Sequence, residues 1–384
     1  MRFHVLGIPH TVTTPEYSAC AFTQKVLKFC KMMTNRGHTV FHYGHEDSQV
    51  ICTEHVSVTD NQLLLETYGS YDWKKESFRH SVSDKANVTF NHRAIGEISK
   101  RKKAGDYVLA FWNCGHSDII NAHKDLICVE PGIGCFNSLV APYCIFESYG
   151  VMHWVYAKYN MSPRWLDAVI PNYFDPNDFS LEPYSLPEDC ETNKAINALE
   201  PGYVLFLGRM IECKGLGIVG DATNRTNDRL VLAGQEDPFK LIAPRDNIIN
   251  IGYVTPEQRK ALLSKAKCLM CPSHYAEPFG GVNVEAQMAG VPVLTSDWGA
   301  YAETVKHGLT GFRCRVMEHF VWALKNVHVL NKKEIQRYAI DNYGLDRVAK
   351  MYEEYFAMIA TVFGKSGFYE PNDARENLEW LQRF

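Results

Sequence analysis

The stretch EPFGGVNVE at residues 277–285 predicts the fold of this chain better than any other part of its sequence. An apolar run at 268–273 precedes it, and a helix-forming run at 286–289 follows it and ends at Gly290. The order is therefore a strand, a loop, a glycine turn and a helix. Strands that alternate with helices predict a parallel sheet, and ligands bind at the carboxyl ends of such strands.

The same residues have the chemistry of an anion site. Gly280 and Gly281 let a ligand approach the main chain closely, because neither has a side chain. The free N–H groups at the start of the helix would attract a phosphate. Glu285 is expected about one turn into the helix, within reach of ribose hydroxyls, and Glu277 precedes the turn, where a sugar could bind. A bare pair of carboxylates at this spacing is usually a solvated helix face, so the Pro-Phe-Gly-Gly insert and the flanking strand and helix decide the interpretation.

This stretch resembles the signature of the retaining glycosyltransferases of family 4, a Glu, seven residues and a second Glu, usually with Phe-Gly after the first. The match covers about residues 165–315 well. Its other parts are the apolar strand at 203–207 with Gly208 and Arg209 at its end, Lys214 and Gly215 after it, and downstream Glu303 and the turn at 308–311. The resemblance implies an α/β protein with the GT-B fold. That fold has two Rossmann-like domains whose parallel sheets face a central cleft, and a C-terminal helix that crosses back to the first domain.

The resemblance also implies an activity, which is transfer of a sugar from a nucleotide-diphosphate sugar to an acceptor hydroxyl with retention at the anomeric carbon. Arg209 and Lys214 would hold the diphosphate, and two fixed cations would stabilise the departing group without a metal or another cofactor. Glu277 would orient the sugar, as a catalytic residue, and Glu285 would hold the ribose. The predicted donor-binding residues are Arg209, Lys214, Gly280, Gly281, Val282, Asn283 and Glu285, with Tyr253 and Val254 beside the base.

The chain length indicates two domains, because 384 residues are too many for one compact core. Prolines and turn formers at 170–179, followed by an acidic and polar linker, mark the boundary between them. We therefore expect an acceptor-side Rossmann-like domain at 1–175 and a donor-binding Rossmann-like domain at 176–360. A C-terminal helix is expected at 361–384 and could pack on the first domain.

The first domain carries two further catalytic candidates. His116 and Glu130 each follow an apolar strand, at 107–111 and at 126–129 respectively. Family members often have a His at such a place, near the reacting sugar. A loop histidine with local hydrogen bonds and a turn carboxylate are the alternatives, and the sequence leaves them open. The loop at 9–17 lacks the Gly-Gly pair that family members often have there, which leaves a main-chain contact from this loop to the donor open.

The composition bounds the class of protein. Apolar residues make up 46% of the chain and charged residues 22%, which is typical of a globular protein. No apolar run reaches the roughly 20 residues that span a bilayer, and residues 1–7 are expected as a buried strand rather than a secretory signal. Twelve scattered cysteines are then expected to be reduced thiols in a cytoplasmic protein. Eleven of the fifteen histidines lie in residues 1–178, and we expect most of them on exposed faces.

The acceptor is the least defined partner. A growing polysaccharide, a lipid, a protein and a modified nucleobase in DNA all remain open. The dense basic run Lys100, Arg101, Lys102 and Lys103 could make a weak membrane or nucleic-acid contact, although such a run is usually a solvated helix end. The alternative functions are a GT-B-fold nucleotide-sugar epimerase, which would need its own acid and base, and a non-catalytic nucleotide-sugar binding module.

Overall fold

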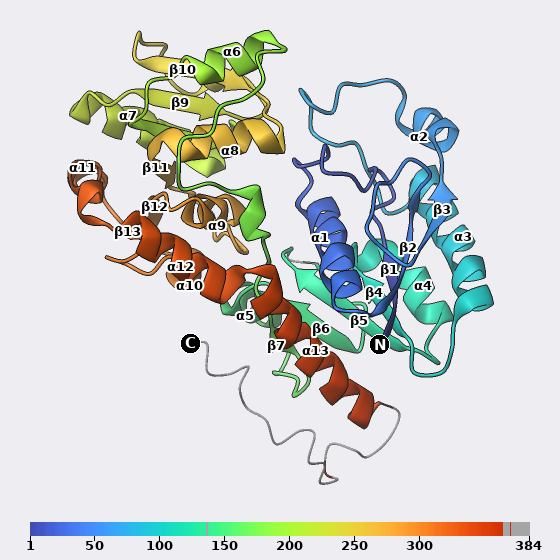
Figure 1. Cartoon of the computed structure of the whole chain (residues 1–384). Coiled ribbons are helices and arrows are strands. Elements are labelled where there is room, and N and C mark those ends of the chain that lie inside the picture. Colours follow the sequence, from blue (N-terminus) through green and yellow to red (C-terminus); the bar gives the residue numbers. More distant parts are fainter. Residues whose placement is uncertain (136, 364–368, 370–384) are drawn as a thin grey trace. The chain divides into compact units, whose positions relative to one another are not determined.

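The computed structural model describes residues 1–135, 137–363 and 369, and these residues form two compact units (Figure 1). Unit 1 contains Met1–Tyr71, Phe78–Tyr173 and the described residues from Leu345 onwards. Unit 2 contains Phe174–Gly344 together with one short segment from the first part of the chain, Asp72–Ser77. Each unit has its own sheet and its own hydrophobic cores.

Unit 1 is built on a seven-stranded parallel sheet with the order β3-β2-β1-β4-β5-β6-β7. Its strands are β1 (Arg2–Leu6), β2 (Thr39–His45), β3 (Glu54–Thr59), β4 (Tyr107–Ala110), β5 (Ile127–Ile133), β6 (Tyr143–Phe146) and β7 (Ala168–Val169). Its helices are α1 (Ala21–Asn35), α2 (Asn61–Tyr68), α3 (Lys85–Arg101), α4 (Ser117–Ala122), α5 (Tyr149–Lys158) and α13 (Leu345–Val362).

Helices cover both faces of this sheet because successive strand residues point to opposite sides. Leu109 packs under α1 and α13, whereas its neighbour Val108 packs under α3 and α4. In Figure 1, α1 and α13 lie side by side on one face of the sheet. Two helices begin at Asp residues whose carboxylates accept main-chain N–H groups of the first turn, Asp60 for α2 and Asp84 for α3.

Unit 2 is built on a six-stranded parallel sheet with the order β10-β9-β8-β11-β12-β13. Its strands are β8 (Tyr203–Leu207), β9 (Leu230–Ala233), β10 (Ile248–Gly252), β11 (Ala266–Cys271), β12 (Val293–Ser296) and β13 (Gly311–Cys314). Its helices are α6 (Glu191–Asn197), α7 (Leu216–Thr226), α8 (Pro256–Lys265), α9 (Gly281–Met288), α10 (Tyr301–Thr304), α11 (Met317–Asn326) and α12 (Lys332–Tyr343).

The strand order of unit 2 is that of a Rossmann fold, in which the chain turns back at the middle of the sheet. The reversal lies between β8 and β11, so the loops after these two strands leave the sheet in different directions and open a crevice at its carboxyl edge. Unit 1 has the same reversal between β1 and β4. Two Rossmann-like domains with parallel sheets, as the sequence predicted, are confirmed.

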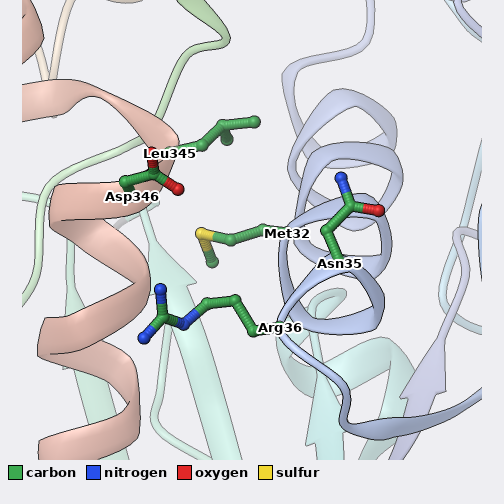
Figure 2. A pocket seen from close by; sticks show the side chains of 5 residues that line it. All are labelled: Met32, Asn35, Arg36, Leu345 and Asp346. Carbon is green, nitrogen blue, oxygen red and sulfur yellow. The ribbon is translucent and has the colours of Figure 1, made fainter.

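The chain returns to unit 1 at Leu345, through α13. Tyr352 and Phe356 of this helix pack against Phe29 of α1 in the unit 1 core. A pocket of about 380 Å³ lies between the end of α1 and the start of α13, lined by Met32, Asn35, Arg36, Leu345 and Asp346 (Figure 2). The first two residues of the helix predicted over 361–384 belong to α13. Most of the remainder falls on residues 364–368 and 370–384, which lie outside the described residues.

Several expectations about composition can be compared with the structure. All twelve cysteines are free thiols, seven of them buried. Among the described residues, none of the helices combines the length and the apolar character needed to cross a bilayer. The expectation of exposed histidines was wrong, because six of the eleven in residues 1–178 are buried. These are His4, His10, His42, His45, His116 and His123.

Candidate functional site

Glu277 lies in the loop after β11, at the carboxyl edge of the unit 2 sheet, and its side chain is buried. The carboxylate accepts three hydrogen bonds. Ser273 Oγ and Lys214 Nζ donate to Oε1 at 2.7 and 2.5 Å, and the Tyr275 hydroxyl donates to Oε2 at 2.8 Å. A carboxylate with this many donors is held in one orientation. The sequence prediction had identified Glu277 and Lys214 but had not placed them in contact.

Lys214 is held beside Glu277 by the turn that follows it. Gly215 has φ of +75°, and a Cβ there would lie 2.1 Å from the carbonyl oxygen of Pro272, so only glycine fits. Burial on its own would lower the pKa of Lys214, but the carboxylate of Glu277 outweighs it and raises the pKa. Burial raises the pKa of Tyr275 to about 12. At neutral pH Lys214 is therefore an ammonium and Tyr275 a phenol.

The glycine turn and the start of α9 form the floor of the site. Gly280 has φ of +75°, and a Cβ there would lie 2.5 Å from the ring of Tyr301. Because α9 begins at Gly281, the N–H groups of Gly281 and Val282 have no partner within the helix and are suited to an anion. The Asn283 main-chain N–H already donates to the Gly280 carbonyl at 3.0 Å.

Asn283 has a structural place in this turn. Its side chain is fully buried, its amide nitrogen donates to the Gly280 carbonyl at 2.5 Å, and Gln287 donates to its oxygen at 2.8 Å. The side chain therefore closes the turn. Among the donor-binding residues predicted in this turn, Gly281 and Val282 therefore offer their main-chain N–H groups to a ligand.

Glu285 is buried on α9 and is paired with Arg259 of α8, whose Nη1 lies 2.8 and 2.9 Å from the two carboxylate oxygens. The sequence reading had missed Arg259. Its Nε is buried and has no hydrogen-bond partner in the described part of the chain. This ion pair joins α8 to α9. It places guanidinium hydrogen-bond donors next to carboxylate acceptors.

Arg209 follows β8 directly and its side chain is exposed. Within the described residues it makes no hydrogen bond or ion pair, in contrast to Lys214. The strand reversal places the end of β8 next to the end of β11, so an unpaired guanidinium extends from the same edge that carries Glu277 and α9. Tyr253 and the buried Val254 follow β10, two strands away along this edge.

His116 of unit 1 is completely buried, in the turn after β4. The main-chain N–H of Trp112 donates to its Nδ1 at 3.2 Å, so Nε2 carries the proton and donates to the Gly7 carbonyl at 3.1 Å. Burial lowers the pKa of His116 to about 3, and the ring stacks on Phe90. The ring ties the end of β4 to the end of β1, and its direct action on a sugar stays a prediction.

Glu130 is also completely buried, and it lies inside β5, which continues to Ile133 beyond the predicted end of that strand. Its Oε1 accepts from the Asn113 amide and its Oε2 accepts from the Val140 main-chain N–H at 2.9 Å. Burial raises the pKa of Glu130. The carboxyl group thus connects the turn after β4 to the loop before β6, and its catalytic role stays a prediction as well.

The sequence analysis missed a buried ion pair in unit 1. Lys25 of α1 pairs with Glu147 at the end of β6 and donates to the Gly132 carbonyl at 2.8 Å. Burial lowers the pKa of Lys25 to about 8. Glu147 directly follows an apolar strand, which is the position that singled out Glu130, so the same argument could have found it.

The basic run 100–103 is the end of α3, and carboxylates face three of its four cations. Lys100 contacts Glu97 at 2.5 Å, Arg101 contacts Glu54 at 2.7 Å and Lys102 contacts Asp125 at 2.6 Å. These contacts agree with a solvated helix end. A contact with a membrane or nucleic acid through this run stays a prediction.

One group of described residues has the spacing of a metal site: His45, Glu46 and Asp47, whose ligand atoms lie within 4.8 Å of one another. Asn61 already donates to both carboxylates, at 2.9 Å to Glu46 and 2.7 Å to Asp47. The group therefore holds the start of α2, and it lies in unit 1, not at the Glu277 edge of unit 2.

The same region of unit 2 matches a known family. Residues 189–343 match the family described as "Glycosyl transferases group 1". This match lies wholly within unit 2. The matched segment contains all nine predicted donor-binding residues, as well as Glu277, and ends at the last residue of α12.

Proteins similar to this chain were found among curated sequences and among solved structures. An uncharacterized glycosyltransferase of Methanocaldococcus jannaschii is 29% identical over 201 residues, which cover 49% of this chain and 50% of that protein. The chain spans half or less of the length of the first curated relatives that it matches. Two solved structures share the fold over most of both chains. Sucrose-phosphate synthase from Thermosynechococcus elongatus has a TM-score of 0.68 at 15% identity, over 94% of this chain and 99% of that one. HepE of Anabaena, solved with UDP, has a TM-score of 0.66 at 14% identity, over 93% and 100%.

Proposed function

We propose that this chain transfers a sugar from a nucleoside diphosphate sugar to an acceptor hydroxyl, with retention at the anomeric carbon. The observation that carries the proposal is the arrangement at the end of β11, where Lys214, Glu277 and the start of α9 converge next to Arg209. Two cations and a helix N-terminus suit a diphosphate. The buried carboxylate beside them suits the hydroxyls of a sugar.

The donor would lie along the carboxyl edge of unit 2. Its diphosphate would meet Arg209, Lys214 and the main-chain N–H groups of Gly281 and Val282. Because Glu277 already accepts from Lys214, the diphosphate would share that ammonium with the carboxylate. Glu285, with Arg259, would hold the ribose hydroxyls. The UDP complex of the Anabaena protein with this fold supports a nucleoside diphosphate as the ligand class.

In the reaction, the bond between the anomeric carbon and the diphosphate oxygen breaks and a bond to the acceptor oxygen forms. The proton of the acceptor hydroxyl passes to the departing phosphate oxygen, so a strong protein base is not needed. Arg209 and Lys214 stabilise the charge on the leaving group, and Glu277 holds the sugar as positive charge develops on its ring. Polysaccharide, lipid, protein and modified nucleobase acceptors all supply the required hydroxyl.

Arg209→Ala should weaken nucleoside diphosphate binding roughly tenfold or more, because it removes a charged hydrogen-bond partner worth ~1.5–3 kcal/mol. The melting temperature should not change, since the side chain is exposed and unpaired within the described residues. Calorimetry with UDP, ADP and GDP measures the first effect and thermal unfolding the second. Arg225→Ala is the matched control, because Arg225 is an exposed arginine in the last turn of α7, far from the carboxyl edge.

Glu285→Gln should weaken binding to a similar degree but should also lower the melting temperature. Arg259 would lose its buried carboxylate partner, and breaking such a pair is destabilising. The contrast between the two variants tests the site geometry. Equal nucleotide affinity in the wild type and both variants would show that the donor site does not lie at this edge of the sheet.

Turnover should not require a divalent metal. The sequence has no Asp-x-Asp at a strand end to bridge a metal and a diphosphate, and Arg209 with Lys214 can supply the positive charge. Rates measured in EDTA should match those in magnesium or manganese. Complete loss of turnover in EDTA, restored by manganese, would contradict this proposal.

A further inference from the structure

Unit 2 contains a short segment that lies far from the rest of the unit in sequence, Asp72–Ser77, and we call it the strap. Two residues at the carboxyl edge of the unit 2 sheet hold it. The amide nitrogen of Gln235 donates to the main-chain carbonyls of Trp73 and Glu76, at 2.6 and 3.2 Å. The ring of Trp73 meets the ring of Tyr253 edge to face, with 5.8 Å between the ring centres.

Gln235 lies two residues after the end of β9 and is buried. The two N–H groups of its side-chain amide donate to carbonyl groups of the strap. Buried polar groups in folded proteins have hydrogen-bond partners, and leaving them without any is costly. The strap is therefore held by specific contacts to the unit 2 edge rather than by a general surface contact.

The strap lies at the end of the donor site where the nucleoside belongs. The pair between Glu285 and Arg259 joins α9 to α8, and α8 begins directly after Tyr253 and Val254. A ribose held at Glu285 therefore directs its base toward the start of α8 and the ends of β9 and β10. These are the strand ends that carry Gln235 and Tyr253.

The strap also has the chemistry to contact a nucleotide. Trp73 is half-buried and offers an indole, whose face suits stacking with a base. Lys74 and Lys75 are exposed, and the ammonium of Lys74 lies 5.5 Å from the centre of the Trp73 ring.

We infer that the strap is a part of the donor site, in which Trp73 is a specificity-determining contact to the nucleobase and Gln235 is the positioning residue that holds the strap. This inference rests on the proposed function, because it assumes a nucleoside diphosphate donor. It adds a residue from outside the segment 189–343, which matches the group 1 family, to the recognition of that donor.

Calorimetry with nucleoside diphosphates and with pyrophosphate separates the parts of the site. Trp73→Ala should weaken binding of the preferred nucleoside diphosphate about tenfold and reduce the differences among UDP, ADP and GDP, because stacking on the base is lost. Pyrophosphate affinity should be unchanged in this variant, whereas Arg209→Ala should weaken both ligands. Trp322→Ala, at a half-exposed tryptophan of α11, is the matched control and should change neither.

Trypsin cleavage after Lys74 and Lys75 gives an independent readout of the strap. A bound nucleoside diphosphate should slow this cleavage in the wild type. Gln235→Leu, which cannot hold the strap, should be cleaved faster and should lose nucleotide affinity while keeping pyrophosphate affinity. This second variant keeps the test decisive if Trp73→Ala does not fold.

The outcomes separate this inference from the proposed function. If Arg209→Ala weakens nucleotide binding but Trp73→Ala and Gln235→Leu do not, the strap is not part of the donor site and only this inference fails. Cleavage that is unchanged or faster with nucleotide would also overturn it, because the ligand would then leave the strap untouched or displace it. If no nucleoside diphosphate binds, or if Arg209→Ala has no effect, the proposed function itself fails.

Discussion

Glu277→Gln is expected to lower kcat roughly 100-fold, the scale of losing one preorganised electrostatic contact at a reacting centre. The amide keeps the shape of the carboxylate but not its charge, so it cannot stabilise positive charge that develops on the sugar ring. Nucleoside diphosphate affinity should stay the same or increase, because Lys214 would no longer be neutralised by Glu277. A steady-state assay of diphosphate release and calorimetry with the diphosphate alone measure the two effects.

Glu318→Gln is the matched control, because Glu318 is an exposed carboxylate in the first turn of α11. It should leave both quantities unchanged. A circular dichroism spectrum and a melting curve show that Glu277→Gln is folded. Near-normal kcat in the folded variant would mean that Glu277 does not act on the reacting sugar.

Unit 1 should lose stability steeply in mild acid. Burial lowers the pKa values of His10, His42 and His116 to about 3, well below the ordinary value of 6.5. Between about pH 3 and pH 6.5 the unfolded chain therefore binds more protons than the folded chain. Their stabilising contribution is complete above pH 6.5 and is lost as the pH falls from 6.5 toward 3, by about 1.4 kcal/mol per pH unit for each histidine.

Urea unfolding at several pH values between 7.5 and 5 measures this slope. His42→Asn should reduce the slope by about 1.4 kcal/mol per pH unit, the contribution of one buried histidine that no longer titrates. His116→Asn should have the same effect and serves if the first variant does not fold. Stability that stays constant down to pH 5 would show that these rings can take up protons without unfolding.

The fold of unit 2 could be predicted because local signals in its sequence agree. Short apolar runs predicted the strands at 203–207 and 268–273, and the structure has β8 and β11 there. Thr255 and Gln258 form a capping box at the start of α8, which begins at Pro256. The predicted helix after the glycine turn begins earlier than its helix-forming run, at Gly281, because the turn itself supplies the first helical residues.

The partners within the site could not be predicted, because they come from distant parts of the chain. Lys214 and Glu277 are 63 residues apart, and the contact between Gln235 and Trp73 spans 162 residues. No periodicity or composition signal connects such positions. The burial of His116 and Glu130 is of the same kind, since it depends on how β1, β4 and β5 and the loops around them pack.

The release of nucleoside diphosphate from a panel of nucleotide sugars, measured with a panel of hydroxyl acceptors in EDTA, tests the central claim most directly. The account predicts that the wild-type chain consumes at least one nucleotide sugar and links that sugar to an acceptor with its anomeric configuration retained, and that Glu277→Gln does so far more slowly. Conversion of the donor to an isomeric nucleotide sugar, or binding with no consumption at all, would contradict it.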